Sequence, residues 1–269
     1  MFNRTHYIGI TGITQPHEIA RFEAVWRGIQ ETHKTPEHGL HVGIMHSRKV
    51  LRGEETSWAG IYPGPRRLKE LLRHECASDV MVTLHYADYE CSSTMGHDLI
   101  HAMQWCPNNS LDALQIDAPW PAPTHLRQAR AQNVNTSPIS IILQVGRTAL
   151  DAITWRPEEC VRRIAEYSDC ISHVLLDMGQ GEGAALQAPR VLPIMHALRR
   201  QLPNLHIAVA GGLNGLCVKE TLRPIVEDFG TGFSIDAQSK LCADLTSRTP
   251  LDVERVSFYL SQACELFAS

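Results

Sequence analysis

Short apolar runs along the chain each end in a residue that can do chemistry. Carboxylates end three of them, Asp117, Asp177 and Asp236, and histidines end two, His46 and His85. Carboxylates and imidazoles are the side chains that most often move protons in enzymes. The other three runs end at Thr11, at Gln144 and at the pair Gly211-Gly212. Arg48 follows His46 two residues later. If the fold gathers these ends, we expect one site for proton transfer or ligand binding.

The pair Gly211-Gly212 has two interpretations. It follows the run 206–210 directly and precedes a segment with helical periodicity. Glycines at this place let the backbone approach a ligand closely, with N–H groups directed at an anion. The simpler interpretation is a tight turn between a strand and a helix. The pair therefore predicts either a turn or an anion site.

The runs that carry these residues have the length and composition of buried strands. They cover residues 7–11, 40–45, 79–86, 111–117, 139–145, 173–177, 206–210 and 232–236. Segments with helical spacing follow them at 16–29, 66–73, 94–105, 124–132, 157–165, 189–198, 216–229 and 249–267. We expect the last helix to begin at Thr249-Pro250-Leu251-Asp252, with a threonine cap, a proline in the first turn and an acid at the third position.

Strict alternation of eight strands with eight helices predicts an α/β protein with a parallel sheet and right-handed crossovers. Eight units in 269 residues favour a closed (β/α)₈ barrel, and we expect residues 1–269 to form a single domain. No Gly-x-Gly-x-x-Gly follows the first strand, which argues against a dinucleotide-binding sheet. In such a barrel the chemistry lies at the carboxyl ends of the strands, and phosphate binds after strands 7 and 8.

Composition narrows the class of protein. The formal net charge is −4 and no Lys/Arg block occurs, so nucleic acid is not an expected partner. No run of about 18 apolar residues is present, and the N-terminus lacks the apolar region of a signal peptide, so no membrane is expected either. The eight cysteines contain no Cys-x-x-Cys, which is typical of reduced thiols. We expect a cytoplasmic monomer or homodimer.

Six short motifs, in order along most of the chain, carry a family resemblance. They are 10–14 (ITGIT), Ser47-Arg48, 111–116 (LDALQI), Leu175-Leu176-Asp177, 210–213 (AGGL) and 235–240 (IDAQSK). The chain resembles phosphoribosylanthranilate isomerases and the wider group of phosphate-binding TIM barrels. The resemblance implies an aldose–ketose isomerisation of the Amadori type on a small phosphorylated metabolite, without a cofactor and related to tryptophan biosynthesis.

The resemblance also implies roles for single residues. Asp177 would be the general acid, and Arg48 would hold a carboxylate or a developing oxyanion. The base would fall on Thr11, where the family has cysteine, and a threonine hydroxyl needs an activating partner for that role. The implied phosphate-binding positions are Gly181, Gly183, Gly211, Gly212, Asp236 and Ser239. Lys240 stands where the family has a glycine, so a backbone anion site there is either lost or replaced by an ammonium group.

Two other functions stay open at this point. His46 and His85, with Asp177 or Asp236, could bind zinc or iron, as the histidines of phosphopentose epimerases do. Arg48, however, stands where those epimerases have an acid. The third possibility is a paralogue that binds a phosphorylated metabolite without catalysis, which the replacement of the family's cysteine by Thr11 favours.

Overall fold

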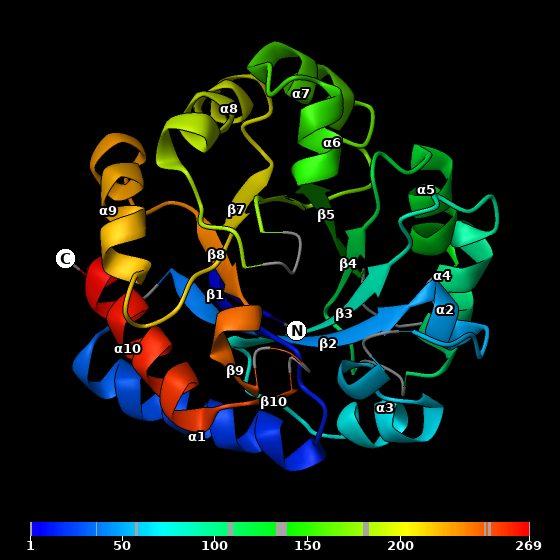
Figure 1. Ribbon diagram of the computed structural model, residues 1–269, viewed down its shortest axis with the longest axis horizontal. Coiled ribbons are helices and arrows are strands. Elements are labelled where there is room, and N and C mark those ends of the chain that lie inside the picture. The colour runs from blue at the N-terminus through cyan, green and yellow to red at the C-terminus, as the bar shows by residue number, and fades with distance from the viewer. Residues whose placement is uncertain are drawn as a thin grey trace.

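Eight parallel strands close into a barrel in the computed structural model, which describes residues 2–35, 37–56, 59–106, 110–132, 139–179, 183–244, 246 and 249–268 (Figure 1). The strands are β1 (His6–Thr11), β2 (His38–Ser47), β3 (Val80–Ala87), β4 (Ala113–Asp117), β5 (Ser140–Gly146), β6 (His173–Asp177), β7 (His206–Ala210) and β8 (Ser234–Ala237). Each strand pairs with the next one, and β8 pairs with β1. The predicted eight-stranded TIM barrel is therefore confirmed.

Helices surround this barrel (Figure 1). They are α1 (Pro16–Thr32), α2 (Arg48–Leu51), α3 (Pro65–Leu71), α4 (Met95–Gln104), α5 (Pro123–Ala131), α6 (Arg147–Ala152), α7 (Pro157–Ala165), α8 (Ala188–Gln201), α9 (Val218–Phe229) and α10 (Val253–Ala268). Five of them carry a proline in the first turn, where its missing N–H leaves no hydrogen bond unmade. None of the helices in the described ranges is both long and apolar enough to cross a membrane.

The predicted start of the last helix is wrong. Thr249–Leu251 is a short strand, β10, that pairs antiparallel with β9 (Cys242–Asp244). The helix begins at Val253, and its first turn is held by Asp252, whose Oδ1 accepts a hydrogen bond from the Arg255 backbone N–H at 3.0 Å. Leu251 is buried, so pairing with β9 and burial decide the conformation of a segment whose local sequence suits a helix start.

Side chains alternate between the two faces of the barrel wall. Along β2, Leu40, Val42 and Ile44 belong to the main hydrophobic core, which packs between strands and helices. The intervening positions of the barrel strands face inward, where a smaller apolar cluster includes Tyr7, Met81 and Leu175. The rest of the interior is filled largely by polar groups. The inward faces of the strands therefore carry both apolar and polar side chains.

Histidines occupy the barrel interior near the amino ends of the strands. The rings of His173 and His206 lie 4.9 Å apart between centroids, and His41 stacks on Tyr7 at 4.7 Å. Burial lowers the pKa of His173 and of His41 to about 3. These imidazoles are therefore neutral in the folded protein at neutral pH.

Candidate active site

A cavity of about 580 Å³, a volume that includes its open mouth, lies at the carboxyl ends of the barrel strands. Six of the polar side chains predicted from the strand ends line it, namely Thr11, His85, Asp117, Gln144, Asp177 and Asp236. Each side chain comes from a different strand, so the barrel brings together residues that are up to 225 positions apart. The structure therefore brings these six strand-end residues together around one cavity.

Asp236 and Thr11 line the cavity together and are joined by hydrogen bonds. The Thr11 hydroxyl lies 2.9 Å from Asp236 Oδ2 and 3.1 Å from Oδ1, and the Ala237 backbone N–H donates to Oδ1 at 3.0 Å. A Cβ atom on Gly9 would lie 2.6 Å from Asp236 Oδ1 and 2.9 Å from His41 Nδ1, so the absent side chain makes room for both groups. Thr11 thus has a carboxylate as its hydrogen-bond partner.

The environment of Asp236 alters its acidity. Burial, with a smaller contribution from the charge of Asp177, raises the pKa of Asp236 to about 7, against the opposing effects of the Thr11 hydrogen bond and of His85. Burial disfavours the ionised form of a carboxylate because the charge loses its hydration. Asp236 is therefore close to half ionised at neutral pH, which suits a group that gives and takes protons.

Asp177 is held by a chain of amide groups that runs across three strands. Gln144 Nε2 donates to Asp177 Oδ2 at 2.9 Å, and Gln115 Nε2 donates to Gln144 Oε1 at 2.8 Å. The Gly179 backbone N–H donates to Asp177 Oδ1 at 2.8 Å. Both oxygens of the carboxyl group are thus fixed in place at the cavity wall. The role of Gln115 was not predicted, although its position two residues before Asp117 places it on the same face of β4.

His85 and Asp117 form a second polar group on the wall of the cavity. His85 Nε2 lies 3.5 Å from Asp117 Oδ2, and the Tyr89 hydroxyl donates to the same oxygen at 2.6 Å. Tyr89 lies in the segment after β3, and it was missed because no strand pattern covers it. Burial raises the pKa of Tyr89 above its ordinary value, and the charge of Asp117 adds to the effect. The phenol is therefore a neutral donor.

Glycines form another part of the wall. Gly211 has a φ of +146° and Gly212 a φ of +57°, and both values are costly for residues with a side chain. A Cβ atom on Gly212 would lie 2.7 Å from the Gly183 carbonyl oxygen, and one on Gly183 would lie 3.3 Å from Ser239 Oγ. The turns after β6, β7 and β8 therefore pack closely against one another. Gly181, also predicted for this wall, lies outside the described residues.

Arg48 lies in a neighbouring pocket together with Tyr62 and Glu90. Its Nη1 atom is 2.7 Å from Glu90 Oε2, so the guanidinium group is paired with a carboxylate. The structure thus separates Arg48 from the cavity that holds Asp177 and Asp236, with Tyr89 lining both pockets.

His46 and His85 do not converge, contrary to the arrangement that a shared metal ion would need. In the pairing of β2 with β3, Met45 lies opposite His85 and His46 opposite Tyr86, so the two histidines point to opposite faces of the wall. His46 contacts the Trp105 ring at 5.3 Å on the helix side, and burial lowers the pKa of His46 to about 4. His46 ends an apolar run, but its position in the strand directs it outward.

Comparison with known proteins supports the fold. Neither a protein-family model nor a curated protein sequence matches the chain. The structure is similar to a phosphoribosyl anthranilate isomerase from Thermococcus kodakaraensis, with a TM-score of 0.58 and 13% sequence identity, over 96% of this chain and 98% of that one. It is also similar to a Rubisco-like protein from Rhodopseudomonas palustris, with a TM-score of 0.53 and 10% identity, over 96% of this chain and 63% of that one. At these identities the likeness shows a shared barrel fold.

Proposed function

We propose that the chain is an acid–base isomerase that converts a small phosphorylated aldose derivative into the ketose by an Amadori-type rearrangement. The observation that carries this proposal is the meeting of Asp177 and Asp236 in one cavity, beside a wall of glycines. The reaction needs one group to protonate the ring oxygen of the sugar and another to remove the proton from C2. Two carboxyl groups with different surroundings are suited to these two tasks.

Asp236 is the base in this proposal. The base must be ionised to take a proton, and a pKa of about 7 makes Asp236 a stronger base than an ordinary aspartate. Thr11 donates a hydrogen bond to Asp236, so its hydroxyl orients the base instead of acting as one. We assign Asp236 to proton transfer and not to phosphate binding, because an ionised carboxylate repels a phosphate group.

Asp177 is the acid. It would deliver its proton to the ring oxygen as the ring opens, which gives the open-chain form from which Asp236 removes the C2 proton. The negative charge of Asp177 raises the pKa of Asp236, which means that ionising both carboxyl groups is costly. A state with one proton on the two carboxyl groups is therefore favoured, and in the reactive form of this proposal Asp177 carries that proton while Asp236 is ionised.

The glycine wall is the proposed phosphate site. Gly183, Gly211 and Gly212 present backbone to the cavity without intervening side chains, and Ser239 adds a hydroxyl group. Backbone N–H groups and hydroxyls are good donors to phosphate oxygens. Lys240 follows Ser239 and is exposed, so its ammonium group can reach an anion from the solvent side. His85, Asp117 and Tyr89 are left for the non-phosphate half of the substrate.

The test is turnover of phosphoribosylanthranilate by the purified chain and by two amide variants, Asp177→Asn and Asp236→Asn. Each variant should lose about 10²- to 10⁴-fold in kcat, the usual contribution of a general acid or base, with a small change in KM. Asp228→Asn is the matched control, because Asp228 is a surface carboxylate paired with His196. A second experiment tests whether the gene complements a strain that lacks phosphoribosylanthranilate isomerase.

Two results separate the open possibilities. Undiminished turnover in both amide variants would overturn the assignment of acid and base. A melting temperature that rises with inorganic phosphate or ribose 5-phosphate, together with no turnover by the unmodified chain, would identify a binding protein without this activity.

A further inference from the structure

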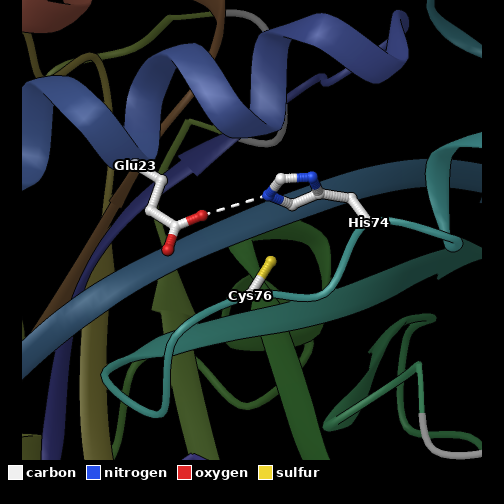
Figure 2. A group of neighbouring side chains, drawn as sticks. All are labelled: Glu23, His74 and Cys76. Atoms are coloured by element: carbon white, nitrogen blue, oxygen red, sulfur yellow. Dashed lines mark hydrogen bonds and ion pairs between the residues drawn. The ribbon is translucent and has the colours of Figure 1, made fainter.

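Three potential metal ligands meet on the outside of the barrel, away from the cavity (Figure 2). Glu23 projects from α1, and His74 and Cys76 lie in the segment between α3 and β3. One ligand atom from each residue lies within 4.8 Å of the other two, and Glu23 Oε2 is 3.0 Å from His74 Nε2. This is the one group of its kind that the described residues contain.

We propose that Glu23, His74 and Cys76 bind a divalent transition-metal ion of the zinc class. Zinc accepts carboxylate, imidazole and thiolate ligands at about 2.0–2.3 Å, which in a tetrahedron separates the ligand atoms by about 3.3–3.7 Å. The three ligand atoms lie within 4.8 Å of one another, and the oxygen–nitrogen distance is 3.0 Å, so binding requires side-chain movements that open this pair slightly and bring the Cys76 sulfur into range. A water molecule would take the fourth position.

The surroundings of Glu23 hold its carboxylate in a suitable orientation. Its Oε1 atom accepts hydrogen bonds from the Ala77 backbone N–H at 3.1 Å and from Arg27 Nη2 at 2.5 Å. The other oxygen, Oε2, is thereby directed at His74. Supporting hydrogen bonds of this kind fix the geometry of metal ligands. The Glu23 side chain is 7% exposed and that of His74 is 29% exposed, so an ion can enter past the imidazole.

Cys76 determines the proton balance of binding. Burial and the charges of Glu23 and Asp112 raise the pKa of Cys76 to about 12, so the residue is a thiol when no ion is bound. A metal ion binds the thiolate, and formation of the metal–sulfur bond therefore releases the thiol proton to solvent. Without an ion, His74 Nε2 donates its hydrogen to Glu23 Oε2, so binding through Nε2 breaks this hydrogen bond and leaves the single ring proton on Nδ1.

The location indicates what the ion would do. The segment with His74 and Cys76 leads into the amino end of β3, whereas the cavity lies at the carboxyl ends of the strands. An ion here would join α1 to the segment that precedes β3, two parts of the chain about 50 residues apart. It would stabilise the fold by binding the native arrangement only.

The experiment uses the full chain, treated with a chelator and then titrated with Co²⁺, a spectroscopic substitute for Zn²⁺. We expect one Co²⁺ per chain with a thiolate-to-cobalt absorption band, and a higher melting temperature in the presence of Zn²⁺. Cys76→Ser should abolish the band and weaken binding at least tenfold, and His74→Gln should also weaken it at least tenfold. Cys91→Ser is the matched control, because Cys91 is a half-buried thiol elsewhere, and it should behave like the unmodified chain.

Three outcomes would overturn the proposal. They are no binding of either ion, binding without a thiolate band, and equal binding by the Cys76→Ser and Cys91→Ser variants. In the last case an Asp117→Asn variant would show whether the ion had bound in the barrel cavity. Cys76→Ser changes a single atom, so the test does not depend on a variant that disrupts packing. Turnover of sugar phosphates has no part in this test, so its outcome is independent of the proposed activity.

Discussion

Acidification should destabilise this protein strongly between pH 6.5 and pH 5. Burial lowers the pKa of His6 and His46 to about 4 and of His41 and His173 to about 3, against 6.5 in an unfolded chain. Below pH 6.5 the unfolded chain therefore binds protons that the folded chain does not bind. Above pH 6.5 these histidines are neutral in both states and do not reduce the free energy of unfolding. As the pH falls below 6.5, the free energy of unfolding decreases.

The size of the effect follows from the same values. At pH 5 each of the four histidines lowers the free energy of unfolding by about 2 kcal/mol, or about 8 kcal/mol together. Asp236 opposes them, because its folded pKa of about 7 lies above its unfolded value and the folded state takes up a proton first. At pH 5 this effect of Asp236 raises the free energy of unfolding by about 3 kcal/mol. The net loss is about 5 kcal/mol, comparable to the whole stability of many domains.

Urea unfolding from pH 8 to pH 5, followed by circular dichroism, measures this loss. His46→Phe provides the variant, since neither ring nitrogen of His46 has a hydrogen-bond partner among the described residues. In this variant the slope of the unfolding free energy against pH should be smaller by about 1.4 kcal/mol per pH unit, which is the contribution of one proton. His17→Gln, at an exposed position, should leave the slope unchanged. A stability that is flat from pH 7 to pH 5, or an equal slope in both variants, would refute the reasoning.

Further predictions concern the cavity. Because Asp236 acts in its ionised form, kcat/KM should fall about tenfold per pH unit below pH 7, and a pH–rate profile without that limb would exclude Asp236 as the base. Thr11→Val removes a hydrogen bond that lowers the pKa of Asp236, so the midpoint of the profile should move to higher pH, whereas Thr11→Ser should keep it. Gly212→Ala adds a Cβ atom at a φ of +57°, 2.7 Å from the Gly183 carbonyl oxygen. The substitution should lower the free energy of unfolding in urea by about 1–3 kcal/mol and reduce the stabilisation by inorganic phosphate. An unchanged urea midpoint would show that the added Cβ atom causes no backbone strain.

Local pattern was enough to predict the barrel and most of the cavity. Apolar runs and helical periodicity are properties of neighbouring residues, and their strict alternation restricts the topology. The run ends at Thr11, Asp177 and Asp236 could be placed in one site because all parallel strands of a barrel end on the same face. Gln115 could have been found as well, since it shares a strand face with Asp117.

His46 shows where such a pattern misleads. The residue ends an apolar run, but β2 extends to Ser47, and the alternation of the strand directs His46 toward Trp105 and the helices. Met45, which has no acid–base chemistry, is the residue of β2 that lines the cavity beside His85. The last helix gives a similar lesson, because a good local start signal at Thr249 is overridden by pairing with β9.

The sequence by itself determined the fold class, the order of the strands and the set of polar strand ends, because these depend on periodicity and composition over short stretches. Only the tertiary structure decided which side chains touch. The contact of Thr11 with Asp236 joins β1 to β8 across the closure of the barrel, in space that Gly9 leaves free. The meeting of Glu23 with His74 and Cys76 depends on how α1 packs against the segment before β3. Neither contact has a local signature, because each is made by chain segments that only the closed barrel brings together.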